Sequence, residues 1–365
     1  MTWLSFIHPH IDVLADRVKT LCRQILAGLS TAICLLVPSL VLAEPHYVTQ
    51  NGLPLADYEN GYAILQSYFG DSVPKRITIE PTNKSRSLFQ PNDNRVLISS
   101  KSQYKEYNAC TVEHESSHLA LYAFTKGASL REEFRFIDEG FATIIEAEAC
   151  HRSEGYKRRA LRVAVDSMRK NRVSFAAVQQ WTNYFGVPDR GNLNLDSYQV
   201  GASFDYFLWD TYGKDRLLAF FRALGESGEL GAALQKAIGK DKASVEAEWL
   251  SYLSQPMPEG SAPEIARLYP DNQASGVPLE TTEIVVEFDQ PMLPSISLLT
   301  NCDDGVCYRD AYWRSDRVLV IKVKLLPDHE YRLGFGNEKT KVQKFLNIEG
   351  TALPISAWTF RTTSQ

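Results

Sequence analysis

The sequence lacks the short motifs that mark several large enzyme classes. It contains no G-x-S-x-G stretch for a serine nucleophile, no P-loop and no dinucleotide-binding glycine fingerprint. It also lacks a basic cluster, and its net charge of −5 argues against nucleic-acid binding. There is no internal repeat or low-complexity tract. The fractions of apolar (44%) and charged (23%) residues are those of an ordinary globular protein.

Histidine is scarce, with seven in 365 residues, yet two histidines fall four residues apart in the stretch HESSH. On a helix, His114 and His118 would lie about 40° apart around the axis and about 6 Å apart along it. Both imidazoles could then reach one metal ion from the same face. Residues 110–124 have helical apolar periodicity. We therefore expect a core-packed helix rather than a surface helix that happens to carry two histidines.

Acidic residues nearby complete the set that a catalytic zinc site needs, which is three protein ligands and an open position for water. Glu139, in a second helical run over residues 134–150, is the candidate third ligand. Glu115 directly follows the first histidine, so it turns towards the water rather than the metal and can act as general base. Asp138 could orient a ligand histidine, or it could cap the start of the second helix.

HESSH, followed by DEGFA at residues 138–142, resembles the gluzincin metallopeptidases, which include thermolysin-like enzymes and zinc aminopeptidases. The resemblance covers residues 101–213 and continues more weakly to about residue 255. It implies that His114, His118 and Glu139 bind one catalytic Zn²⁺ and that Glu115 is the catalytic base. The metzincin pattern would need a third histidine in H-E-x-x-H-x-x-G-x-x-H, which this sequence does not have.

A third segment, YQVGAS at residues 198–203, is similar to the Y-x-x-G-A-S segment of gluzincin aminopeptidases. The resemblance implies that the Tyr198 hydroxyl faces the carbonyl oxygen on which negative charge develops. The alternative is a tyrosine that packs at the start of a helix. The sequence has no G-x-M-E-N-type stretch, with which aminopeptidases hold a free amino terminus. We therefore favour an endopeptidase.

The expected fold class is α+β, with a mainly helical, gluzincin-like catalytic domain and a small sheet over residues 44–255. A linker rich in proline and glycine follows at 256–263, and residues 264–365 have the period-two pattern of an all-β sandwich that resembles bacterial Ig-like domains. Strands are predicted at 76–81, 95–99, 284–288, 318–323, 331–335 and 358–362. Helices are predicted at 53–69, 110–124, 134–150, 153–171, 175–185, 214–223, 230–238 and 242–253. In gluzincins an edge strand binds extended peptide, and residues 95–99 are the candidate for it.

Residues 1–43 have the features of a secretory signal peptide. Arg17, Lys19 and Arg23 precede an apolar run that ends with a small residue, Ala43, where we expect cleavage. The protein is therefore expected to be exported and to be periplasmic or secreted. The apolar run approaches the length of a membrane-spanning helix, so an uncleaved membrane anchor is the alternative.

Four cysteines remain after residue 43, namely Cys110, Cys150, Cys302 and Cys307. An even number in an exported protein suggests disulfides. Cys302 and Cys307 bracket a turn, where a local bridge is plausible. If the two histidine- and glutamate-bearing helices run antiparallel, a Cys110–Cys150 bridge would join them.

The sequence thus predicts an exported zinc-dependent metallopeptidase that acts on peptide or protein substrates. The first alternative is an exported zinc-binding protein without catalysis, against which the intact Glu115 argues. The second is a cell-surface interaction protein that works through its Ig-like domain. That domain could also attach the enzyme to a cell surface or cell wall.

Overall fold

The computed structural model describes residues 44–84, 87–99, 108–180, 193–257, 260–293, 298–300, 310–336, 343 and 345–364. Met1–Glu44 and Pro45–Gln365 form separate units, and nearly all described residues belong to the second. The predicted signal segment, Cys302 and Cys307 lie outside the described residues. In the part of the chain that is described, no helix has the length and apolarity needed to cross a membrane.

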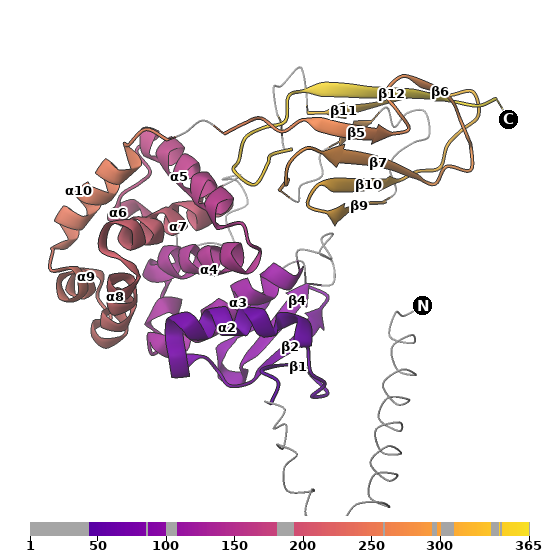
Figure 1. Ribbon diagram of the computed structural model, residues 1–365. Coiled ribbons are helices and arrows are strands. Elements are labelled where there is room, and N and C mark those ends of the chain that lie inside the picture. Colours follow the sequence, from indigo (N-terminus) through magenta and orange to yellow (C-terminus); the bar gives the residue numbers. More distant parts are fainter. Residues whose placement is uncertain are drawn as a thin grey trace, which may run out of the picture. The chain divides into compact units, whose positions relative to one another are not determined.

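The first part of the second unit contains a small mixed sheet next to helices (Figure 1). The strand order is β1-β2-β4-β3, formed by Tyr47–Thr49, Ile77–Thr82, Arg95–Ser99 and Leu88–Gln90 respectively. β1 and β4 are parallel to β2, whereas β3 is antiparallel to β4. The prediction that residues 95–99 form an edge strand was wrong, because β4 has neighbours on both sides. Alternation of side chains reports which face of a strand is buried and carries no information about its neighbours.

Most of the other described residues in this part of the chain lie in helices. They are α2 (Glu59–Phe69), α3 (Asn108–Phe124), α4 (Arg135–Ala149), α5 (Ser153–Arg169), α6 (Phe175–Val178), α7 (Leu193–Tyr212), α8 (Lys214–Ser227), α9 (Leu230–Ile238) and α10 (Lys242–Leu253). α2, α3 and α4 lie side by side, and α4 packs against α7 (Figure 1). Their shared core is rich in buried aromatic side chains, including Phe136, Phe141, Phe204 and Trp249. Of the predicted run at 175–185, Phe175–Val178 form the four-residue helix α6, and residues 181–185 lie outside the described residues.

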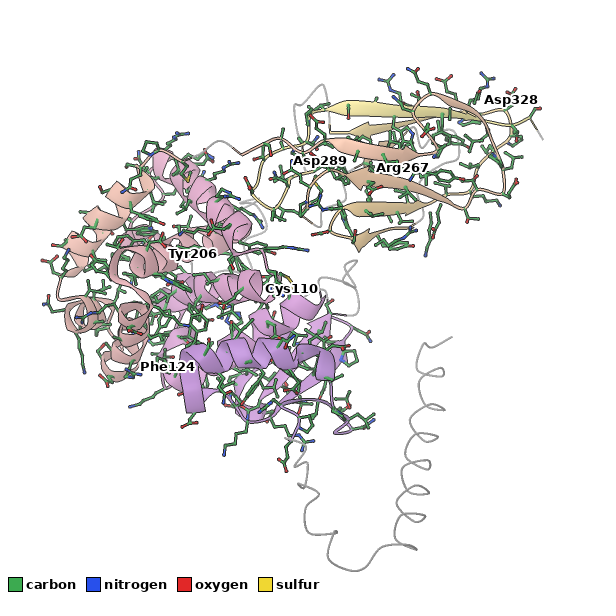
Figure 2. All side chains as sticks on the ribbon, in the orientation of Figure 1. Cys110, Phe124, Tyr206, Arg267, Asp289 and Asp328 are labelled. Atoms are coloured by element: carbon green, nitrogen blue, oxygen red, sulfur yellow. A yellow bond between two sulfur atoms is a disulfide. The ribbon has the colours of Figure 1, made fainter. Side chains whose placement is uncertain are left out.

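A disulfide joins α3 to the end of α4, where Cys150 is the C-cap residue. Cys110 and Cys150 are bonded, with their Cα atoms 5.7 Å apart. Cys110 lies near one end of α3 and Phe124 at the other (Figure 2). Two further contacts join the helices, His114 to Glu146 and His118 to Asp138. Residue numbers rise along α3 while those of their partners fall along α4, so the two helices are antiparallel. The sequence analysis expected this bridge on the condition that the two helices run antiparallel, and both are observed.

Two glycines allow α4 and α7 to approach closely. A Cβ atom added at Gly201 on α7 would lie 1.8 Å from the carbonyl oxygen of Phe136 on α4. A Cβ atom at Gly140 on α4 would lie 2.3 Å from the carbonyl carbon of Gly201. Either methyl group would force the two helices apart, because the nearest atoms at both positions belong to the backbone and cannot rotate aside. The glycine of the YQVGAS segment thus sets the distance between the two helices, and with it the position of Tyr198.

Gly201→Ala is expected to lower the free energy of unfolding by about 1–3 kcal/mol, because overpacking outweighs the helix propensity that alanine gains. Gly231→Ala on α9 is the matched control, since the nearest atom to its added Cβ is 3.9 Å away. The control should be as stable as the wild type or slightly more stable. Urea unfolding curves measure both variants. Equal midpoints for Gly201→Ala and the wild type would contradict the close-contact argument.

The second part of the unit consists of two four-stranded sheets. One has the order β5-β7-β10-β9, formed by Ile265–Tyr269, Glu283–Phe288, Val318–Lys322 and Asp310–Ser315. The other has the order β6-β12-β11-β8, formed by Ala274–Val277, Ser356–Thr362, Glu330–Phe335 and Leu298–Thr300. Side chains of both sheets share one core, among them Phe288, Trp313, Tyr331 and Trp358. The all-β arrangement agrees with the period-two pattern, while the likeness to Ig-like domains stays a prediction.

Candidate metal centre

Helices α3 and α4 bring His114, His118 and Glu139 together. Glu139 Oε2 lies 3.3 Å from Nε2 of His114 and 3.3 Å from Nε2 of His118. The three ligand atoms all lie within 4.8 Å of one another. Among the described residues, this is the one group of three or more His, Cys, Asp and Glu side chains that could hold a metal ion. Sequence spacing placed the two histidines on one helical face, and the antiparallel packing of α4 brings Glu139 opposite them.

The two distances from Glu139 Oε2 to the histidine nitrogens fit a zinc ion. Zinc bonds of about 2.0–2.1 Å at tetrahedral angles place neighbouring ligand atoms about 3.3–3.4 Å apart. The two measured separations between Glu139 Oε2 and the histidine nitrogens are 3.3 Å. Two imidazole nitrogens and one carboxylate oxygen are also the donor set of many catalytic zinc sites. The residues present therefore suit this metal in both geometry and chemistry.

Each histidine also has a carboxylate at its other ring nitrogen. His118 Nδ1 lies 2.9 Å from Asp138 Oδ2, and His114 Nδ1 lies 3.0 Å from Glu146 Oε2. A carboxylate at Nδ1 keeps the proton on that nitrogen and leaves the lone pair of Nε2 for a metal. Asp138 is fully buried inside α4, which begins at Arg135, so Asp138 does not cap this helix.

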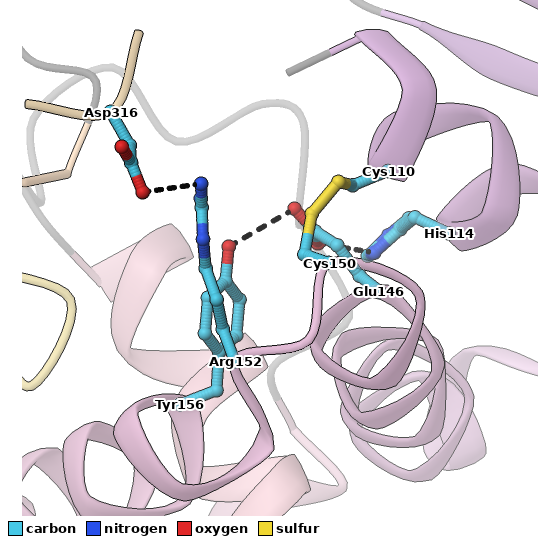
Figure 3. Close-up of a disulfide and its surroundings, with 7 residues drawn as sticks. All are labelled: Cys110, His114, Glu146, Cys150, Arg152, Tyr156 and Asp316. Carbon is cyan, nitrogen blue, oxygen red and sulfur yellow. Dashed lines mark hydrogen bonds and ion pairs between the residues drawn. A yellow bond between two sulfur atoms is a disulfide. The ribbon is translucent and has the colours of Figure 1, made fainter. Parts of the chain in front are cut away.

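Glu146 is a site residue that the sequence reasoning missed. It lies seven residues after Glu139, two turns further along the same face of α4. Its second carboxylate oxygen accepts a hydrogen bond of 3.5 Å from the hydroxyl of Tyr156 on α5 (Figure 3). The helical spacing from Glu139 could have identified Glu146, but only together with the knowledge that α3 runs antiparallel beside it.

The centre is electrostatically suited to a cation. Burial lowers the pKa of His118, but the carboxylates of Asp138 and Glu139 outweigh it and raise this pKa to about 9. Burial likewise opposes the change at His114, where Glu139 and Glu146 raise the pKa well above its ordinary value. The pKa of Glu139 is lowered despite burial, because the two histidines and Arg135 favour its charged form. The neighbouring carboxylates thus stabilise the positively charged form of both imidazoles. A metal ion bound to the neutral imidazoles could supply that positive charge instead.

Glu115 and Tyr198 border the three ligands. Glu115 is buried, and its burial raises the pKa of the carboxyl group against the opposing effect of His114 and His118. A carboxyl group with a raised pKa is suited to take up and release a proton near neutral pH. The ring of Tyr198, from α7, has its centroid 6.1 Å from that of His114. The structure therefore brings both residues named by the sequence analysis to the same centre.

Phe89 is a second residue that sequence reasoning did not find. It lies on β3, and its ring stacks on His118 with centroids 4.6 Å apart. This contact fixes the plane of the imidazole and covers one of its faces. A strand of three residues leaves too little alternation to be recognised in the sequence. The contact also places the outer strand β3 directly beside the metal centre.

No protein-family model matches this sequence, and no curated protein matches it. Among solved structures, the chain is similar to an M1 zinc metallopeptidase from Deinococcus radiodurans, with 15% sequence identity and a TM-score of 0.37. The match covers 57% of this chain and 47% of that one, so the chain spans about half the length of this neighbour. A similarity at this level carries no argument about function, which has to rest on the geometry of the centre.

Proposed function

We propose that this protein is a zinc-dependent metallopeptidase whose metal is held by His114, His118 and Glu139. The observation that carries the proposal is that Glu139 Oε2 lies 3.3 Å from Nε2 of both histidines, the separation of neighbouring ligands around zinc, next to a buried glutamate outside this set. A site that only holds zinc has no need of Glu115. The paired carboxylates of Asp138 and Glu146 also suit a centre whose histidines must keep a fixed orientation.

A zinc ion in this centre would supply Lewis acidity and lower the pKa of coordinated water to about 7. Glu115 accepts the proton of the attacking water and delivers it to the amine that leaves when the peptide bond breaks. The Tyr198 hydroxyl donates a hydrogen bond to the carbonyl oxygen as negative charge develops there. Asp138 and Glu146 hold the two imidazoles in one tautomer throughout.

The position of the outer strand β3 favours a peptide as the substrate. Among the described residues, β4 is the one strand that pairs with β3, and Phe89 of β3 contacts His118. An extended peptide could add to the other side of β3 by main-chain hydrogen bonds, which would bring its backbone past the centre. The role first assigned to residues 95–99 thus moves to Leu88–Gln90 in this proposal.

Internal cleavage and export belong to the same proposal. The sequence has no motif for holding a free amino terminus, which favours an endopeptidase. The secretory features of residues 1–43 and the Cys110–Cys150 disulfide both favour an oxidising compartment outside the cytoplasm.

The decisive experiment measures zinc by inductively coupled plasma mass spectrometry in the purified protein and in His118→Ala. We expect one zinc per chain in the wild type and loss of zinc in the variant, since a two-ligand site binds this metal far more weakly. Incubation with a quenched-fluorescent peptide library should give internal cleavage. This activity should disappear after chelation and return when zinc is added.

Two results would contradict the proposal in different ways. If the wild type holds no zinc after reconstitution, HESSH is part of an ordinary helix and the metal site is wrong. If zinc is bound but no peptide is cleaved, the centre holds a metal without peptidase activity. The two sheets over residues 264–365 would then become the place to look for a binding function.

A further inference from the structure

Arg135 forms ion pairs with two carboxylates that serve the metal centre. It begins α4, and its guanidinium group pairs with Glu139 Oε1 through one amino group. The other amino group lies 3.4 Å from Asp138 Oδ2, the oxygen that also faces His118. The Arg135 side chain is mostly buried, while those of Asp138 and Glu139 are almost completely buried. One cation therefore contacts both the candidate ligand and the carboxylate that orients a ligand histidine.

The two oxygens of Glu139 have different partners. Oε2 faces Nε2 of both histidines at 3.3 Å, whereas Oε1 is paired with Arg135. A carboxylate can bind a metal through one oxygen or through both. Binding through both oxygens would take an additional coordination position, which a catalytic zinc site must leave open for water or substrate. The partner of Oε1 therefore decides whether that position stays open.

We infer that Arg135 is a positioning residue that restricts Glu139 to binding the metal through Oε2 alone. This inference rests on the proposed zinc site and adds to it a reason for the open coordination position. Arginine suits the task because its planar, permanently charged group presents two donors in a fixed geometry. It also places a permanent positive charge beside the two buried carboxylates of Asp138 and Glu139.

A purely structural role for Arg135 is the competing explanation. Arg135 and Glu139 are spaced i, i+4 in the first turns of α4, where such pairs contribute modestly to helix stability. A structural role would leave the coordination of the metal unchanged when Arg135 is replaced. The positioning role predicts a change in coordination number and in metal affinity. These two quantities separate the explanations independently of catalytic activity.

The test replaces Arg135 by methionine, which has a similar unbranched stem without charge or donors. Apoprotein is loaded with Co²⁺, whose visible absorption weakens as its coordination number rises from four to five. We expect Arg135→Met to show this weaker spectrum, because Glu139 can then bind through both oxygens. Zinc affinity should fall about 10–100-fold, the range for residues that orient metal ligands. Turnover should fall with little change in KM, since the open position is compromised rather than the peptide contact.

Matched variants make the result specific. Arg131→Met removes a neighbouring arginine that contacts the carbonyl oxygen of Gly228 instead, and its Co²⁺ spectrum should equal that of the wild type. Arg135→Lys keeps the charge with a single ammonium group and should restore part of the wild-type spectrum. Arg135→Gln is a second neutral variant, in which we expect the same spectral change. It serves as the test if Arg135→Met does not fold.

The outcomes distinguish this inference from the proposed function. A wild type that binds neither Co²⁺ nor Zn²⁺ would remove the metal site itself. The other outcome is a four-coordinate spectrum in the wild type, with the same spectrum and zinc affinity in the neutral variants. This result would leave the metal site intact and overturn the role of Arg135.

Discussion

Glu115→Gln is expected to reduce turnover of a peptide substrate by about 10²- to 10⁴-fold, the contribution of general acid–base catalysis. Glutamine has nearly the shape of glutamate but cannot accept the proton of water or deliver one to the leaving amine. Zinc content should remain one per chain, because Glu115 is not among the three residues whose ligand atoms converge. The measurement is kcat on a cleavable peptide, together with the zinc content of the same preparation.

A matched control for this substitution lies two residues earlier on the same helix. Glu113 is also buried, but its carboxyl oxygen Oε2 accepts a hydrogen bond of 2.8 Å from the Tyr47 hydroxyl, and the group fills the space beside Gly61. Burial raises the pKa of Glu113 to about 8, so its carboxyl group is largely neutral at pH 7 and glutamine imitates that form. Glu113→Gln should keep wild-type turnover. Wild-type turnover in Glu115→Gln as well would remove the general base from the proposal.

The ligand set could be predicted from the sequence because it depends on short-range spacing. His114 and His118 share a face of any helix that contains them, and Glu115 necessarily points to a different side. Glu139 needed one further assumption, that the next helix packs against the first. Arg135 obeys the same spacing rule, four residues before Glu139, yet it carried no signal because arginine is not a metal ligand. Its role emerges only once the partner of each Glu139 oxygen is known.

Other features depend on long-range packing, which spacing does not report. The sequence identified β4 as a strand but placed it at the edge, because strand order is set by pairing between distant segments. Phe89 reaches His118 only because the short strand β3 folds back antiparallel to β4. In the second part of the unit, the sequence identified β7, β10, β11 and β12, whereas β5, β6, β8 and β9 were not recognised. The helices were recovered more completely, since most carry their own periodicity, but α7 (Leu193–Tyr212) was not among those predicted.

Removal of the disulfide in Cys110→Ser/Cys150→Ser is expected to lower the free energy of unfolding by about 4 kcal/mol, as loop-closure entropy gives for this span. The two cysteines are 40 residues apart in sequence, and the closed loop contains the whole metal centre. The unfolded chain gains conformational freedom when this loop opens, which lowers its free energy relative to the folded protein. Urea unfolding of the metal-free protein measures the effect without a contribution from zinc binding.

The same double variant should also bind zinc more weakly, because the disulfide continues a series of contacts between the two helices. Cys110 precedes His114 by one helical turn, and Cys150 follows Glu146 by one turn (Figure 3). Loss of the bridge lets these helix ends separate, and His114 moves with its end of α3. Cys302→Ser/Cys307→Ser is the control for zinc affinity, since it leaves the Cys110–Cys150 pair intact and should bind zinc as the wild type does. If the Cys110/Cys150 variant unfolds at the wild-type urea concentration, the bridge does not constrain the two helices, and zinc affinity in that variant should then be unchanged.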